Sequence, residues 1–168
     1  MRRVLVWTAV IVTALLLQST VFAQIELVEA KPELVYLATI VLALLEGPVS
    51  GSLAGFFGGM AQDFLLNQPK GITALTLTLL GYGVGLLRAY VVSPSPLLPV
   101  LLVGGATFVG VLFHGVVSFL LSQLAVDWVY ELRVALLSAL YNAILTPFFF
   151  PVIRRVAEAS QAKKVFRW

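Results

Sequence analysis

The sequence predicts an all-α integral membrane protein of about six transmembrane helices, the first ones short or irregular. Of its 168 residues 60% are hydrophobic and 11% charged, with a mean hydropathy of +1.01, whereas soluble domains carry about 25% charged residues. Within one apolar stretch, Gly51, Gly55 and Gly59 recur at four-residue steps and Asp63 follows one step later. Small residues at this spacing let a neighbouring helix approach closely in lipid. This stretch is therefore the predicted packing centre of a membrane bundle.

At about 20 residues per span, the chain has room for five or six crossings and no separate soluble domain. We expect one multi-pass domain over residues 1–168, with spans at about 4–23, 34–45, 49–66, 72–90, 97–124 and 134–153 and a basic tail at 154–168. The chain has no cysteine and one histidine. These counts exclude disulfides, thiolate metal sites and multi-histidine metal sites.

The first apolar run follows Arg2 and Arg3 and continues to about residue 23. A secretory signal peptide is the alternative, with Val21 and Ala23 at acceptable positions before a cleavage point after Ala23. The length of the run and the downstream charges favour a retained first span.

The second apolar run, 34–45, has 12 residues, about 18 Å as a helix against a hydrocarbon core of about 30 Å. Glu46, Gly47 and Pro48 then break it. We expect a short, tilted or re-entrant segment that together with the glycine helix returns the chain to the side where it started. Glu46 is expected to approach Arg88 as a structural clamp.

The later spans are separated by turns at 67–71 and 93–96. The fourth run holds Gly81, Gly83 and Gly85. Aromatic residues in 123–133 indicate an interfacial loop. Two prolines one turn apart in the last run, Pro147 and Pro151, predict a bend.

Positive charges set the orientation. With six spans, one side holds eight of the eleven Lys and Arg residues: Arg2, Arg3, Arg88, Arg154, Arg155, Lys163, Lys164 and Arg167. Lys31, Lys70 and Arg133 lie on the other side. The positive-inside rule therefore predicts that both termini are cytoplasmic.

Asp63 has two interpretations. It is a buried carboxylate that pairs with a partner or ligand, or it reaches water at the interface and fixes a loop together with Lys70. His114, Ser118 and Asn142 are possible polar contacts between helices, since such side chains hydrogen-bond across membrane bundles. Motifs for catalysis are absent from the sequence, and neither a cofactor nor nucleic acid is expected.

The order of these features resembles the MreD family of the bacterial rod-shape system. The resemblance rests on an Arg-led span running into LLLQSTVF, on Lys31-Pro32-Glu33-Leu34, on the Gly51 to Asp63 helix, on the loop Gln68-Pro-Lys-Gly71 and on Gly81-Tyr-Gly83. It covers nearly the whole chain and is sharpest over 47–85.

This resemblance implies a non-enzymatic scaffold of the peptidoglycan elongation complex (elongasome) in the inner membrane. Its implied direct partner is MreC. MreB, RodA and a class B penicillin-binding transpeptidase are implied as further partners through the complex. The implied fold is similar to the substrate-binding subunits of energy-coupling-factor transporters. Gly51, Gly55, Gly59 and Asp63 are the motif positions carried over.

We hypothesise that one glycine stripe packs inside the bundle and another faces MreC, with Gly55 and Gly83 as the two positions at which substitution by Leu would test the contact. The alternative function is a vitamin or small-solute binding subunit with a polar pocket near Asp63, Asn67 and Asp127. A third, a proton-coupled carrier using Asp63 and His114, ranks last because these residues are isolated in the sequence.

Overall fold

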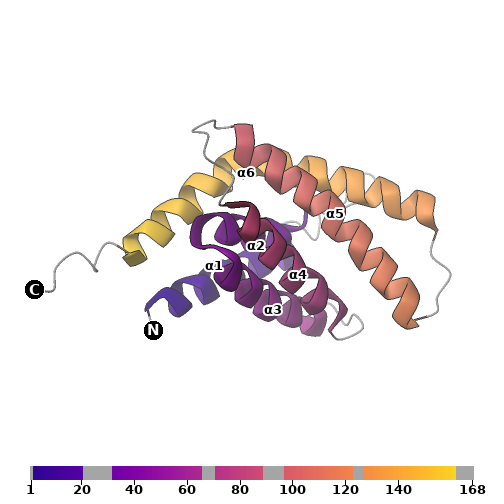
Figure 1. Cartoon of the computed structure of the whole chain (residues 1–168), viewed down its shortest axis with the longest axis horizontal. Coiled ribbons are helices and arrows are strands. Elements are labelled where there is room, and N and C mark those ends of the chain that lie inside the picture. Colours follow the sequence, from indigo (N-terminus) through magenta and orange to yellow (C-terminus); the bar gives the residue numbers. More distant parts are fainter. Residues whose placement is uncertain (1, 21–31, 66–70, 89–96, 123–126, 162–168) are drawn as a thin grey trace, which may run out of the picture.

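The computed structural model describes residues 2–20, 32–65, 71–88, 97–122 and 127–161, and the regular elements in them are all helices (Figure 1). Each residue range expected to span the membrane overlaps one of these helices, and the largest difference is at the last range, 134–153, which lies inside a longer helix. The helices are α1 (Arg2–Thr20), α2 (Leu34–Glu46), α3 (Pro48–Leu65), α4 (Ile72–Leu87), α5 (Leu97–Ser122) and α6 (Trp128–Gln161).

The short helix α2 lies at the centre of the bundle. All of its residues from Leu34 to Ala43 are buried, and it packs against each of the other five helices. Its 13 residues span about 20 Å, less than a hydrocarbon core of about 30 Å. An all-round apolar helix of this length is stable because its neighbours cover every face.

The chain reverses between α2 and α3 at Gly47, whose φ of 98° favours glycine over residues with a Cβ. Pro48 then begins α3, a position that needs no backbone donor. The prediction that Glu46 and Arg88 form a structural clamp is wrong with respect to an ion pair. Within the described residues, their side chains form no salt bridge. Instead, Arg88 approaches the reversal itself, with its Nη1 atom 3.5 Å from a Cβ position built on Gly47.

Helices α5 and α6 form an antiparallel hairpin that lies across one side of the bundle (Figure 1). The expected interfacial loop over 123–133 is partly wrong, because α6 already begins at Trp128. Asp127 caps this start: its Oδ1 accepts hydrogen bonds from the backbone N–H groups of Val129 and Tyr130, at 3.0 and 3.3 Å.

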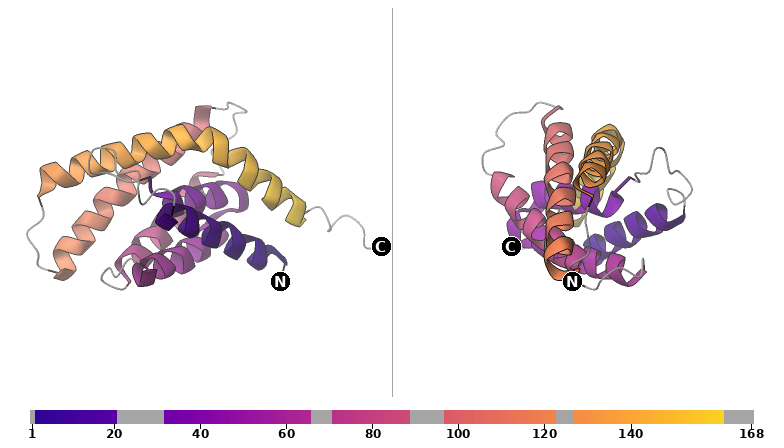
Figure 2. Two further views of the ribbon diagram at one scale, coloured as in Figure 1. Left: turned by 180° about the vertical axis from the view of Figure 1, so that it is seen from behind. Right: turned by 90° about the vertical axis from the view of Figure 1, so that its right-hand side faces the viewer.

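Helix α6 bends along its length (Figure 2). Pro147 and Pro151 both lie inside it, and each removes a backbone donor and displaces the preceding turn. The helix continues through both prolines to Gln161. The prolines therefore redirect α6 without ending it.

The surface has the polarity expected of a protein in lipid. Exposed side chains on α3 to α6 include many large apolar residues, such as Phe57, Leu101 and Phe148. Polar side chains are instead buried, among them Gln62, Asp63, Thr107 and Asn142. Helices α5 and α6 are long and apolar enough to cross a membrane, and three further apolar helices are shorter.

Helix α1 is part of the bundle. Ile11, Ala14 and Leu15 are buried against other helices. The cleavage point after Ala23 lies outside the described residues. Helix α1 begins and α6 ends toward the same side of the molecule (Figures 1 and 2).

Candidate functional site

The glycine stripe of α3 packs directly on the backbone of α4. A Cβ atom on Gly51 would lie 2.5 Å from the Gly81 carbonyl oxygen, and one on Gly59 would lie 2.6 Å from the Cα of Ala74. Gly55 would place its Cβ against the carbonyl group of Leu77. Real Cβ atoms do not approach backbone this closely. The bare glycines therefore allow the closest contact between the two helices.

The three glycines of α4 divide between two faces of the helix. Gly81 packs on Gly51, and Gly85 packs on Pro48. Gly83 is exposed and has no atom within 4 Å of a Cβ position. Residues two apart on a helix differ by about 200° in direction, so Gly83 points away from the α3 contact.

Gly83 opens into an apolar groove between α4 and α5 with a volume of about 620 Å³. Gly105 lines the opposite wall on α5, and it too has no atom within 4 Å of a Cβ position. Thr76, Val109 and Phe113 are among the other lining residues. We call this feature the α4–α5 groove. It exposes two glycines on facing helices, so a third helix could approach both backbones.

Asp63 is fully buried and joins the end of α3 to the start of α4. Its Oδ2 accepts a hydrogen bond from the backbone N–H of Gly71 at 2.8 Å and a longer one from Ala74 at 3.4 Å. The first N–H groups of a helix lack partners within that helix, and a carboxylate there also interacts favourably with the helix dipole. The expectation that Asp63 reaches water is wrong, since its exposed fraction is 0%. Lys70 lies outside the described residues.

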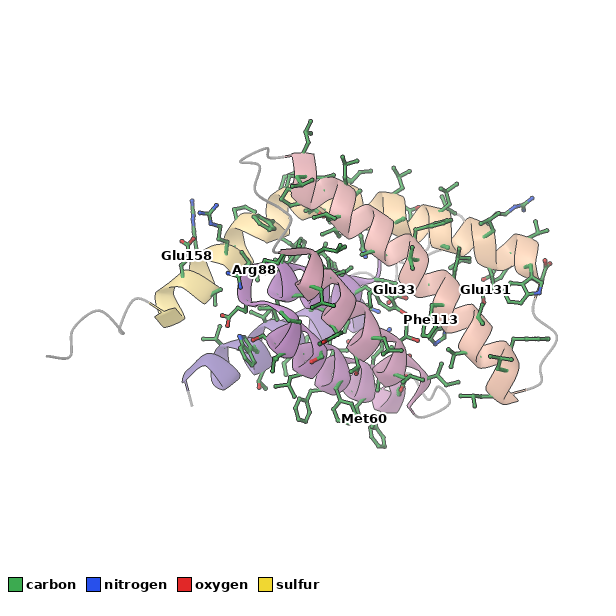
Figure 3. All side chains as sticks on the ribbon, viewed as in Figure 1. Glu33, Met60, Arg88, Phe113, Glu131 and Glu158 are labelled. Atoms are coloured by element: carbon green, nitrogen blue, oxygen red, sulfur yellow. The ribbon has the colours of Figure 1, made fainter. Side chains whose placement is uncertain are left out.

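A second polar network centres on Glu33, immediately before α2 (Figure 3). Its Oε2 accepts hydrogen bonds from the side-chain amides of Gln18 and Gln62, each at 3.1 Å. Its backbone carbonyl accepts one from Asn142 Nδ2 at 3.0 Å, and the same nitrogen donates to Thr107 Oγ1 at 3.1 Å. The network thus ties α1, α3, α5 and α6 to the start of α2.

His114 is half-buried on α5, with Nε2 3.4 Å from the Thr73 hydroxyl on α4. Asp63 is near enough to act on His114 electrostatically. Ser118, one turn further along α5, is half-buried and has a bonding partner.

The pocket expected near Asp63, Asn67 and Asp127 gains no support. Asp127 is exposed, and its carboxylate is used to cap α6. Asn67 lies outside the described residues. Among the described side chains, no group of three His, Asp or Glu residues could hold a metal ion.

Sequence reasoning singled out Asn142 and Asp63 but missed Gln18, Glu33 and Gln62 as parts of one network. Gln18 interrupts the apolar run of the first span, and Gln62 directly precedes Asp63. A polar residue inside a predicted span indicates a polar contact between helices, because it needs a partner within the bundle.

A model of a known protein family matches the chain that carries these features. The family model described as rod shape-determining protein MreD matches residues 1–156. The chain belongs to the MreD family. Membership implies a role in determining rod shape and association with the rod-shape machinery. MreD is a shape-determining structural family and is not a known enzyme family.

No curated protein and no solved structure matched this MreD-family chain. The likeness to energy-coupling-factor subunits therefore stays a prediction. The family and the two long apolar helices together indicate a membrane protein.

Proposed function

We propose that this MreD-family protein is a non-enzymatic scaffold of the peptidoglycan elongation complex that binds MreC through transmembrane helix packing. In this proposal it is a multi-pass protein of the bacterial inner membrane with both termini in the cytoplasm. MreB, RodA and a class B penicillin-binding transpeptidase join it through the complex. The lysines and arginines counted above support this orientation.

The observation that carries the proposal is the α4–α5 groove. Its two exposed glycines, Gly83 and Gly105, leave backbone uncovered on facing helices. In lipid, helices associate through close packing of small residues, since apolar surface alone gives no preference for protein over acyl chains. The groove therefore suits one transmembrane helix of MreC.

Other apolar hollows suit a helix less well. One of about 230 Å³ lies between α1 and α3, and one of about 370 Å³ is formed by α1, α2 and α6. Bulky side chains line them, including Trp7 and Phe57 in the first and Phe149 in the second. A helix there would contact side chains, and it would approach backbone less closely than at Gly83 and Gly105.

The test is co-purification of MreC in mild detergent with Gly83→Leu and Gly105→Leu variants. A Cβ atom at either position has nothing within 4 Å, so a leucine there projects into the groove; the protein should fold normally and recover at least tenfold less MreC. Gly55→Leu is uninformative here, because Gly55 packs on the α4 backbone and its substitution disturbs the fold itself.

The matched control is Ala9→Leu, which enlarges an exposed residue of the hollow formed by α1, α2 and α6. It should recover MreC as the wild type does. Wild-type recovery by both glycine variants, or loss with Ala9→Leu alone, contradicts the assignment of the α4–α5 groove.

A further inference from the structure

One further hollow carries a positive charge in its wall. It has a volume of about 220 Å³ and lies between the end of α2, the end of α4, the start of α5 and the second half of α6. The residues that line it are Leu44, Leu45, Arg88, Pro99, Leu102 and Phe150. By contrast, the described residues that line the α4–α5 groove and the two hollows beside α1 include no charged side chain. We call this feature the Arg88 hollow.

The guanidinium of Arg88 has no anionic partner within the part of the chain that the structure describes. Arg88 is exposed and directly follows the last residue of α4. Its Nη1 atom lies against the reversal between α2 and α3, 3.5 Å from a Cβ position built on Gly47. Neither Glu46 nor another described carboxylate forms a salt bridge with it. Because a guanidinium carries five donors and keeps its charge at neutral pH, Arg88 is available to bind an anion.

The other charges at this end of the molecule do not neutralise Arg88. Figure 3 shows Arg88 toward the same end as Glu158. The carboxylate of Glu158 is already paired with Arg154 at 2.7 Å. Arg155 is exposed and forms no salt bridge with a described residue. The positive charge here favours an anion from outside the chain.

The rest of the wall is apolar, since leucine, proline and phenylalanine side chains line the hollow beside Arg88. A phosphate group accepts two parallel hydrogen bonds from one guanidinium. An acyl chain suits the apolar side chains next to it. A phospholipid carries both groups in one molecule, whereas free phosphate would leave the apolar wall uncovered. The combination of a lone arginine and an apolar wall therefore favours a phospholipid.

We propose that the Arg88 hollow binds the phosphate group of an anionic phospholipid, with part of an acyl chain against its apolar wall. Basic pockets between transmembrane helices on the cytoplasmic side are typical sites for anionic headgroups. The cytoplasmic leaflet follows from the orientation in the proposed function, whereas lipid binding itself does not depend on MreC. The hollow is smaller than the α4–α5 groove and takes part of a lipid, with no room for a helix.

The experiment measures phosphatidylglycerol binding to the full-length protein in a neutral detergent, by native mass spectrometry and by the rise in melting temperature. Arg88→Gln is compared with Arg155→Gln, because each removes one positive charge from the same end and only Arg88 lines the hollow. We expect Arg88→Gln to weaken binding about fivefold, and Arg155→Gln to weaken it less than about twofold. Arg88→Lys keeps the charge but loses the planar fork, so its affinity should lie between those of Arg88→Gln and the wild type.

Melting without added lipid verifies that each variant is folded. Phosphatidylcholine and soluble glycerol phosphate are the comparison ligands, and both should bind the wild type more weakly than phosphatidylglycerol. Equal phosphatidylglycerol affinity of Arg88→Gln and the wild type, or an equal loss with Arg155→Gln, would overturn the inference. Equally tight binding of glycerol phosphate would overturn the assignment to a lipid, and equally tight binding of phosphatidylcholine would overturn the assignment to an anionic one. Co-purification of MreC with Arg88→Gln should match the wild type, so the proposed function is tested separately.

Discussion

Asp63 is a carboxylate held in the interior of an apolar bundle by backbone amides of another helix. Its two hydrogen bonds come from Gly71, whose φ of 101° places it in the left-handed region, and from Ala74 in the first turn of α4. Gly71 has no side chain of its own with which to cap α4. Asp63, in the last turn of α3, supplies that cap, so a side chain of one helix satisfies the first backbone N–H groups of the next.

Replacing Asp63 with alanine should therefore destabilise the protein. Hydrogen bonds to a charged group contribute about 1.5–3 kcal/mol each, and the loss leaves N–H groups of α4 without a partner. Thermal unfolding in detergent measures the change. Asp127→Ala is the matched control, because it removes an exposed cap on α6 worth about 1 kcal/mol. An Asp63→Ala melting temperature equal to that of the wild type would show that the cap contributes nothing.

At the residue scale, the hydrogen bond between Asn142 and Glu33 could not be predicted from the sequence. Asn142 is recognisable as a polar residue in a span, but its partner is the carbonyl of Glu33, 109 positions away. The sequence contains no periodicity that connects them. Only the burial of α2 against α6 brings these two groups together.

At the scale of elements, the glycine spacing predicted which face of α3 packs on α4. The glycines of α4 were not separated by face. Four-residue steps place Gly51, Gly55 and Gly59 on one face of a helix, and that face packs on α4. Gly81, Gly83 and Gly85 were grouped together in the sequence, although two-residue steps alternate between faces. Helix geometry applied to that spacing would have separated Gly83 from the other two.

The same substitution on the two kinds of face should therefore have opposite outcomes. Gly55→Ala places a methyl group on the Leu77 backbone, and overpacking of this kind costs about 1–3 kcal/mol. Gly83→Ala adds a methyl group in open space and should leave stability unchanged or slightly raised. Unfolding of the two variants in one detergent makes the comparison. Equal stability would mean that α3 and α4 are not in close contact.

Helices were located from the sequence because apolar runs end at Gly, Pro and polar clusters. The start of α6 was missed because Trp128 and Tyr130 were interpreted as interface anchors, while Asp127 was not recognised as a helix cap. The central position of α2 was not predicted either. A short apolar run gives the same signal whether it re-enters the membrane or is enclosed by other helices.

At the scale of the whole molecule, apolar side chains fill the core and also cover much of the surface, while a smaller set of polar side chains is buried among the helices. This arrangement is stable in lipid, where a buried amide or carboxylate finds its partners within the bundle. The α4–α5 groove and the two hollows beside α1 are apolar and open to the surface. A molecule built this way offers surfaces for other helices, in keeping with a role in rod-shape determination.

The central claim, that MreC occupies the α4–α5 groove, is tested most directly by cysteine cross-linking in native membranes. The chain contains no cysteine, so one cysteine at Gly83 or Leu101 can be paired with a series of cysteines along the MreC transmembrane helix. The account predicts disulfides from both positions, recurring every three to four MreC residues, and none from Leu16 on α1. Cross-links from Leu16 with none from the groove would contradict it.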